Sequence, residues 1–441
     1  MAFLVSKSRY TAMLYGLLSL GIYGYVAYSL LRENAASLVL AMCVLFILLW
    51  GLQKQAFSWK TLLLLGFLFR FVFIGAIPHL SQDFYRYLWD GNIMLMGFNP
   101  YAYTPNALFD LIQFPQASLL HEQMGSLSQA NLSNYPPLSQ YTFKAMAFFS
   151  QKTLLPGLLF LRLLYGFVEL FIFWGGRLIL QKLGLTNKLL GWYFINPLLI
   201  VETYGNLHGE GLMMGLFLLG LGLLTQRKII VSAFFISLSI AFKLFPLLFL
   251  PLFYFYLKPK ERLFFYATVL LIMVLGFAPF TTQSSLVNYW NTLRLWFDTF
   301  EFNASIYYLI RALGYQLVGY NIIKQVGVVM PFVILLWVGY LSLKHKSPTQ
   351  KQLLLHLLWV SCLYFFLATT VHPWYIITLL ILGIFSGYLF PLLWSLTVFW
   401  SYSAYGAAVV SESFEIIALE YFFVFVCLGY ELYKKPLLKH L

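Results

Sequence analysis

Long apolar segments, separated by short loops that carry most of the charge, recur along the whole of this 441-residue chain. An apolar helix of about 20 residues crosses a bilayer. Because the membrane core offers no water to the backbone, a spanning segment must satisfy its own hydrogen bonds, which a helix does. The pattern predicts an all-α polytopic bundle of about 12 to 14 transmembrane helices. We place spans at residues 11–31, 36–53, 60–78, 153–180, 189–203, 209–225, 229–243, 244–257, 263–280, 322–343, 350–370, 374–388, 390–405 and 413–432.

The distribution of charge indicates how the bundle is oriented. Hydrophobic residues make up 61% of the chain and charged residues only 10%, which excludes a soluble globular protein. A net charge of +13 would suit a nucleic-acid partner, but the Lys and Arg residues fall in clusters between apolar spans, as topology signals do. With a cytoplasmic N-terminus, 18 of the 28 basic residues lie inside. We predict cytoplasmic termini, a lipid bilayer as the surroundings, no nucleic-acid partner and one integral-membrane domain over 1–441.

Two long loops, 79–152 and 281–321, lie outside the cytoplasm in this topology. The segment 138–151 is apolar but too short to span alone, and 300–315 mixes aromatic with scattered polar residues. Such segments are typical of helices that lie at the membrane interface. We therefore expect interfacial helices in both extracytoplasmic loops.

The stretch 81–103, at the start of the first loop, is dense in polar and aromatic side chains. Asp83 and Asp90 are seven residues apart, so they share one face if the stretch is helical, and Arg86 lies within reach of that face. A carboxylate beside a cation suits a general base next to an anionic substrate. The same residues also suit an interfacial helix that only anchors itself at the headgroups. Spacing alone leaves both interpretations open.

Three further turns reach the outer side and add candidate acids, bases and cations. His208 and Glu210 stand in a Gly-rich turn, Lys243 ends a short apolar span, and a third turn at 371–375 carries His372, Trp374 and Tyr375. A satisfied His–Glu pair or a lysine that snorkels to the interface would explain these residues without a substrate. No HExxH or comparable spacing indicates a metal site. The outer Trp residues, Trp89 and Trp374 among them, are candidates to stack on sugar rings.

Several motifs follow one another between about residue 60 and residue 405. They are SQDFYRYLWDG, GFNPYAYTP, YPPLSQ, GNLHGEGLMM, FKLFPLLFLP, FEFNASIYYLIR and HPWY. In this order they resemble the bacterial polyprenol-phosphate-mannose-dependent mannosyltransferases, a group within the GT-C superfamily of integral-membrane glycosyltransferases. The combination is more specific than any single motif.

The resemblance implies an inverting transfer of a hexose, mannose in the first place, from a polyprenyl-phosphate-linked donor to the hydroxyl of a glycan or glycolipid acceptor. It also implies an extracytoplasmic active site in the bacterial inner membrane. The Asp that the superfamily carries in its first large outer loop as catalytic base matches Asp83. Many members have an adjacent acidic pair where this chain has Gln82 before Asp83. This difference favours a metal-free carboxylate, and we expect no cofactor, with a divalent metal as the less favoured alternative.

Elementary chemistry agrees with a single base. An inverting transfer needs one group to take the acceptor proton while cations neutralise the departing phosphate. Glycosidases need a second carboxyl to protonate a poor leaving group, but a phosphate leaves without it. We assign Arg86 and Asp90 to the acceptor side, and His208, Glu210, Lys243 and His372 to the donor pocket. The full set of candidate substrate-binding residues is Arg86, Trp89, Asp90, Asn99, Tyr101, His208, Glu210, Lys243, Arg294, Arg311, His372, Trp374 and Tyr375.

Two other functions would also use outer loops and a lipid-linked saccharide. A transporter or flippase is typically built from two related halves with polar sites at mid-membrane, whereas here the polar residues gather at one face and no internal symmetry is visible. A surface-glycan ligase or polymerase would share the loops and the donor but move a longer chain. We therefore favour a glycosyltransferase over these two functions.

Overall fold

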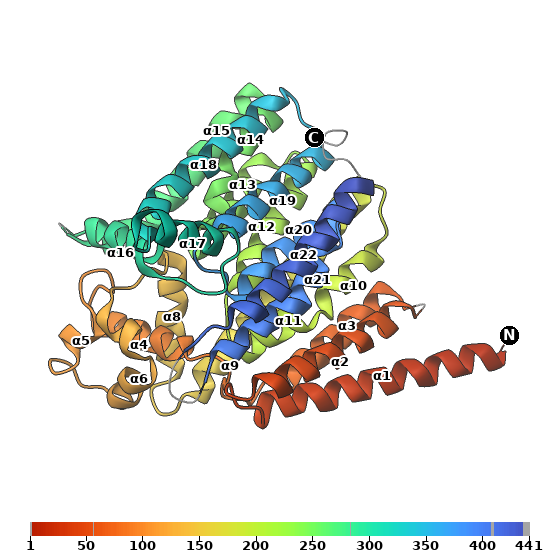
Figure 1. Ribbon diagram of the computed structural model, residues 1–441, viewed down its shortest axis with the longest axis horizontal. Coiled ribbons are helices and arrows are strands. Elements are labelled where there is room, and N and C mark those ends of the chain that lie inside the picture. The colour runs from red at the N-terminus through yellow and green to blue at the C-terminus, as the bar shows by residue number, and fades with distance from the viewer. Residues whose placement is uncertain (1, 56, 283, 407–409, 435–441) are drawn as a thin grey trace. The chain divides into compact units, whose positions relative to one another are not determined.

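The structure is a computed structural model that describes residues 2–55, 57–282, 284–406 and 410–434 (Figure 1). All regular elements in these ranges are helices, and the only β-type pairings there are two isolated bridges. The predicted all-α class is confirmed. The chain divides by its internal contacts into two compact units that are discontinuous in sequence, and we describe each by itself. The single domain over 1–441 stays a prediction.

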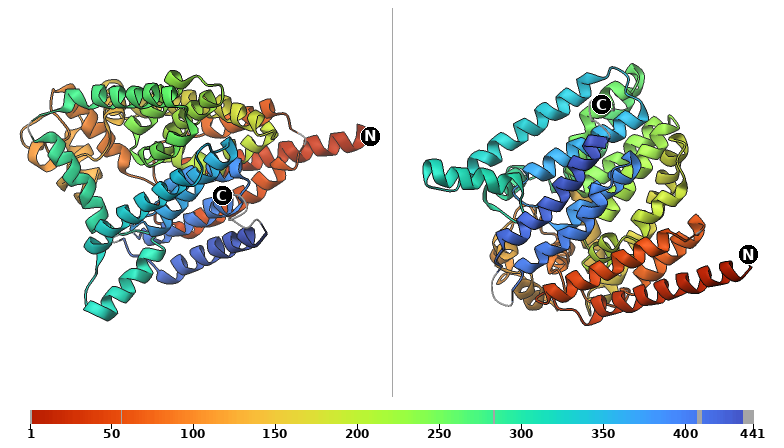
Figure 2. Two further views of the ribbon diagram at one scale, coloured as in Figure 1. Left: turned by 90° about the horizontal axis from the view of Figure 1, so that it is seen from above. Right: turned by 45° about the vertical axis from the view of Figure 1, so that its right-hand side comes forward.

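The first unit contains residues 2–81, Leu180–Gly211 and residues 372–434. Helix α1 packs against α2 and α3, which are the red helices of Figure 1 and Figure 2, and α21 packs against α22 (Figure 1). Its helices are α1 (Ala2–Tyr28), α2 (Ala35–Gln53), α3 (Trp59–Phe71), η1 (Asn187–Leu190), α10 (Gly191–Phe194), α11 (Pro197–Ile200), η2 (Val201–Gly205), η5 (Pro373–Tyr375), α20 (Ile376–Ser386), α21 (Phe390–Thr397), η6 (Val398–Ala404) and α22 (Phe414–Lys434).

The second unit contains Gln82–Ile179 and Leu212–Val371 among the described residues. Two of its helices begin or end a few residues inside the first unit, namely α9 and α12. Its helices are α4 (Asp83–Leu95), α5 (Pro105–Leu108), α6 (Ala117–Gln123), α7 (Ser126–Ala130), α8 (Pro137–Phe149), α9 (Leu155–Lys182), α12 (Glu210–Thr225), α13 (Ile229–Phe242), η3 (Phe245–Phe249), α14 (Leu250–Tyr256), α15 (Pro259–Phe277), η4 (Ala278–Phe280), α16 (Ser285–Thr299), α17 (Ile306–Val318), α18 (Ile323–Lys344) and α19 (Gln350–Leu367).

Six helices are long and apolar enough to cross a membrane, judged by length and composition among the described residues. They are Ala35–Gln53, Leu155–Lys182, Pro259–Phe280, Ile323–Lys344, Gln350–Leu367 and Phe414–Lys434. The pair Pro197–Gly205 and Glu210–Thr225 would add a seventh span, although it is bent by 114°. These helices are those of an integral membrane protein. The count of 12 to 14 spans stays a prediction, because several predicted spans are short or broken helices.

Both predicted outer loops are helical. The first loop, 79–152, contains α4 to α8, and the second, 281–321, contains α16 and α17. The predicted helix at 138–151 is α8, which packs closely along α4. A Cβ atom at Gly91 of α4 would lie only 2.0 Å from the carbonyl oxygen of Phe143 on α8, so only glycine permits this approach. On which side of a membrane these helices lie stays a prediction.

Candidate active site

Helix α4 begins at Asp83, the predicted base. A carboxylate in the first helical turn is favourable, because the N-terminus of a helix carries partial positive charge. Asp83 is partly exposed, whereas the residues from Arg86 to Met94 are buried. The preceding side chain, Gln82, donates from Nε2 to the carbonyl oxygen of Met124, 3.3 Å away. The start of α4 is thus fastened to the turn that precedes α7.

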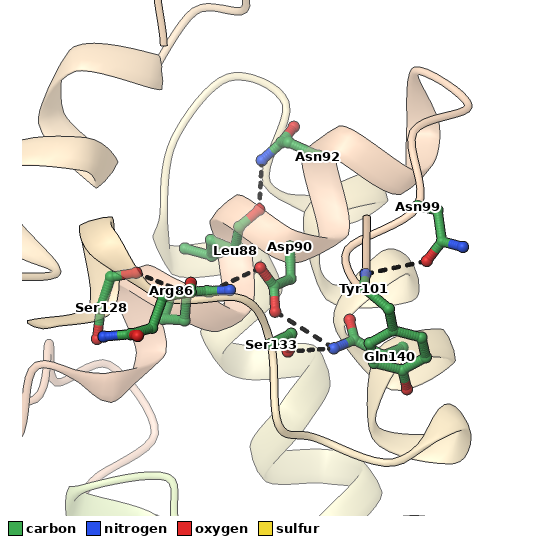
Figure 3. Close-up of polar contacts among 10 residues, drawn as sticks. Arg86, Leu88, Asp90, Asn92, Asn99, Tyr101, Ser128, Ser133 and Gln140 are labelled. Carbon is green, nitrogen blue, oxygen red and sulfur yellow. Dashed lines mark hydrogen bonds and ion pairs between the residues drawn. The ribbon is translucent and has the colours of Figure 1, made fainter. Parts of the chain in front are cut away.

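Arg86 and Asp90 form a buried ion pair one helical turn further on (Figure 3). Arg86 Nε lies 2.7 Å from Asp90 Oδ1, and both residues are buried, Asp90 with 0% and Arg86 with 6% exposure. Arg86 Nη1 also donates to the carbonyl oxygens of Ser128 (2.5 Å) and Asn131 (2.9 Å). The guanidinium therefore holds α7 and the residue after it against α4.

Gln140 on α8 completes this cluster (Figure 3). Its Nε2 donates to Asp90 Oδ2 at 3.3 Å and to Ser133 Oγ at 2.5 Å. We call Arg86, Asp90, Ser133 and Gln140 the α4 clamp. Its opposite charges cancel within the protein, and Arg86 fastens the loop beside α4. That Arg86 and Asp90 shape the acceptor side stays a prediction.

Three more candidates of the first loop are engaged inside the second unit. The Trp89 ring has 0% exposure and packs on the rings of Phe114 and His121, so it presents no open face to a sugar. Asn99 donates from Nδ2 to the carbonyl oxygen of Phe280 (2.8 Å), and its Oδ1 accepts from the Tyr101 backbone N–H. The third candidate is Tyr101, whose hydroxyl donates to the Tyr135 carbonyl oxygen, 2.7 Å away. Burial raises the pKa of the Tyr101 hydroxyl well above its usual value.

The two arginines of the second loop each face a carboxylate. Arg294 is exposed and its Nε lies 3.0 Å from Asp298 Oδ2, an i,i+4 pair on α16. Arg311 Nη1 contacts Glu301, which also accepts hydrogen bonds from Tyr307 and Asn321. Arg294 and Arg311, two of the candidate substrate-binding residues, are thus paired with acids of their own loop.

Lys243 is the predicted cation with the most suitable place in the second unit. It is the first residue after α13, its backbone is extended, and it is partly exposed. The preceding carbonyl, that of Phe242, accepts a 2.5 Å hydrogen bond from Ser139 Oγ on α8. Helix α8 therefore contacts both α4, which begins with Asp83, and the end of α13, which carries Lys243.

In the first unit, the turn after η2 gathers a second buried polar cluster. His208 Nδ1 lies 2.9 Å from Glu202 Oε2, and the same oxygen accepts from Asn206 Nδ2 at 2.9 Å. Tyr402 donates from its hydroxyl to Glu202 Oε1 (2.9 Å) and accepts from Asn206 Nδ2 (2.9 Å). Ser81 Oγ lies 3.1 Å from His208 Nε2. We call Ser81, Glu202, Asn206, His208 and Tyr402 the Glu202 network.

The backbone that brings this network together is unusual. Leu207 has a φ of 65°, in the left-handed region that bulky residues rarely adopt. The His208 backbone N–H donates to the Glu202 carbonyl oxygen, 2.9 Å away. His208 pairs with Glu202, which the sequence did not suggest, and Glu210 begins α12 as a buried acid in its first turn.

Trp374 joins two histidines in the first unit. Its ring centroid lies 3.5 Å from that of His208 and 4.3 Å from that of His372, with interplanar angles of 28° and 12°. Two imidazoles this close to one indole do not fit side by side on one face, so they lie on opposite faces. Both faces of Trp374 are therefore covered, and it cannot stack on a sugar in this arrangement. Tyr375 packs edge-on against His372 and Trp374.

Sequence reasoning missed the parts of these clusters that are distant in the chain. The position of Glu202 inside an apolar segment indicated a structural or functional role, because acids are rarely found there without one. Nothing in the sequence indicated Tyr402 as its partner. Among the described residues, no group of three or more His, Cys, Asp and Glu side chains could hold a metal ion. Independence from a metal stays a prediction.

Comparisons with known proteins agree with the motifs. The family described as "Alpha-(1->6)-mannopyranosyltransferase, N-terminal domain" matches residues 9–258. Alpha-(1->6)-mannopyranosyltransferase A of Mycobacterium tuberculosis (strain ATCC 25618 / H37Rv) is 25% identical over 173 residues, which are 38% of this chain and 31% of that relative. The match thus spans less than a third of the relative's length. No solved structure matches the chain.

Proposed function

The chain belongs to the alpha-(1->6)-mannopyranosyltransferase family, and from this premise we propose that it transfers a hexose, mannose in the first place, from a polyprenyl-phosphate-linked donor to an acceptor hydroxyl. We place the reaction on the extracytoplasmic side of a bacterial inner membrane, with both termini in the cytoplasm. The acceptor is a glycan or glycolipid. Family membership speaks for transfer over transport or polymerisation.

The observation that carries the mechanism is the contrast between the two acids of α4. Asp90 has 0% exposure and is engaged by Arg86 and Gln140. Asp83 lies two turns earlier on the same helix and remains partly exposed. A general base must reach the hydroxyl whose proton it takes, so Asp83 is the base.

In this mechanism Asp83 accepts the proton of the acceptor hydroxyl while that oxygen attacks the anomeric carbon of the donor. The bond from this carbon to the phosphate oxygen breaks on the opposite face, and polyprenyl phosphate leaves with the bonding electrons. The product has the inverted configuration. Lys243, which is partly exposed in the same unit as Asp83, neutralises the charge that grows on the leaving phosphate. His372, also partly exposed, stays a predicted ligand of the donor.

The test is a transfer assay with purified protein and a panel of polyprenyl phosphate hexoses, in which released polyprenyl phosphate is measured. We expect Asp83→Asn to lower turnover by about 10² to 10⁴ fold, the usual contribution of a general base, with donor binding retained. Asp110→Asn, which changes an exposed acid of the same loop, is the matched control and keeps wild-type turnover. Near-normal turnover by Asp83→Asn would remove Asp83 from the mechanism, and release from no donor in the panel would refute the proposed reaction.

A further inference from the structure

The Glu202 carboxylate is buried with 0% exposure at a turn of π-helix. The groups that donate to it are the Asn206 amide, the Tyr402 hydroxyl and the His208 imidazole. Two of these donors lie in the turn after η2 and the third in η6 (Val398–Ala404). A carboxylate held by three donors has one orientation, because each of its oxygens is fixed. It therefore serves as a rigid reference point for the groups around it.

His208 is fixed at both ring nitrogens. A carboxylate only accepts hydrogen bonds, so the His208 Nδ1 that faces Glu202 carries the proton. The other nitrogen, Nε2, pairs with the Ser81 hydroxyl. With 1% exposure and both nitrogens engaged by the protein, His208 does not bind a substrate directly. What it offers to its surroundings is the face of its ring.

Two further aromatic rings continue the stack from the face of the His208 imidazole. Trp374 stacks on His208, and His372 stacks on the opposite face of Trp374. His372 directly precedes η5, and of the two histidines in this stack it is the partly exposed one, whereas His208 is buried. Offset stacking fixes the plane of each ring relative to the next. The orientation of His372 is therefore linked to Glu202 through two intervening rings.

We propose that Glu202 is a positioning residue, which with Asn206 and Tyr402 fixes His208 and, through Trp374, holds His372 as the group that binds the phosphate of the lipid donor. This inference rests on the proposed function, since it names the ligand of the same site. The proposal gives the two histidines of the predicted donor pocket different roles. His208 positions Trp374, and His372 contacts the ligand. A preorganised donor to a phosphate oxygen binds more tightly than one that must be ordered on binding.

The test is a double-mutant cycle on the binding of polyprenyl phosphate in detergent, with no transfer required. We expect Glu202→Gln and His372→Ala each to weaken binding about tenfold, and the double variant to bind no more weakly than His372→Ala. Glu420→Gln is the matched control. Glu420 is also a fully buried acid of the first unit and accepts from Trp394 Nε1 (2.9 Å), and its change leaves affinity unaltered. Wild-type affinity in Glu202→Gln, or losses that multiply in the double variant, would overturn the proposal.

A second measurement judges the positioning apart from the donor. In ¹⁵N spectra of protein labelled at histidine, we expect Glu202→Gln to shift the imidazole signals of both His208 and His372, and Glu420→Gln to shift neither. A change at His208 alone would overturn the link through Trp374. Wild-type protein that does not bind polyprenyl phosphate would instead refute the proposed donor, so the two failures are distinguishable.

Discussion

The α4 clamp and the Glu202 network are both buried polar clusters around one carboxylate, yet their partners differ. Asp90 faces Arg86, a permanent cation four residues away on the same helix. Glu202 faces an amide, a hydroxyl and an imidazole, and its Tyr402 partner is 200 residues away. The clamp balances charge and fastens a loop. The network orients a ring, and no permanent cation is among these three donors.

This difference teaches how buried acids divide their roles. A buried ion pair gains little net stability over apolar packing, but it is costly to break, because one charge is then left without its counterpart. A carboxylate without a permanently charged partner loses hydrogen bonds when it is removed, and this leaves no Arg or Lys charge without its counterion. The clamp should therefore be the more sensitive cluster in stability, and the network the more sensitive one in ligand binding.

The largest effect is expected for Asp90→Ala. It leaves the Arg86 charge buried without its counterion, so we expect a loss of about 3–5 kcal/mol in the free energy of unfolding. Thermal unfolding of the purified protein in detergent measures it. Arg294→Ala, which breaks an exposed i,i+4 pair, is the control and should lose about 0–1 kcal/mol. Equal losses in the two variants would show that the Arg86–Asp90 pair is not a buried clamp.

Glu202→Ala should have an intermediate effect on stability. It removes the acceptor shared by three donors but strands no permanent cation, and we expect a loss of about 1.5–3 kcal/mol. The same unfolding assay gives the comparison. A loss larger than that of Asp90→Ala would break the distinction between the two clusters.

The smallest effect is expected for Tyr402→Phe. The change deletes one hydroxyl, which donates to Glu202 and accepts from Asn206, and leaves the other contacts of the network in place. Hydrogen bonds within membrane proteins contribute about 0.6 kcal/mol each on average, so we expect the loss of these two bonds to lower the free energy of unfolding by about 1 kcal/mol. An unchanged unfolding temperature would indicate that Tyr402 does not stabilise the network.

Several features of the fold could be predicted because they depend on local patterns. Runs of apolar residues predict helices whatever their neighbours, so the all-α membrane class was accessible from the chain alone. The stretch from Asp83 onward is helical as its spacing allowed, and Arg86 and Asp90 meet because residues four apart share a helix face. The broken helices around η2 were not predicted, since hydropathy does not reveal a 114° bend.

The candidate site was harder to predict, because burial decides what a polar side chain can do. Trp89 and Trp374 look alike in sequence as sugar-stacking residues, but one lies in a core and the other between two histidines. Arg294 and Arg311 look like free cations until their partners, Asp298 and Glu301, are seen. Composition gives the inventory of side chains but not their pairing.

By itself the sequence determined the helices, their apolar character, the family and the place of Asp83 in the chain, because these follow from local periodicity and ordered motifs. Only the tertiary structure decided that Asp90 is enclosed while Asp83 stays partly open, and that Glu202 meets Tyr402 and His208 rather than water. Such choices depend on which distant segments exclude solvent from a side chain, and that is a property of packing in three dimensions.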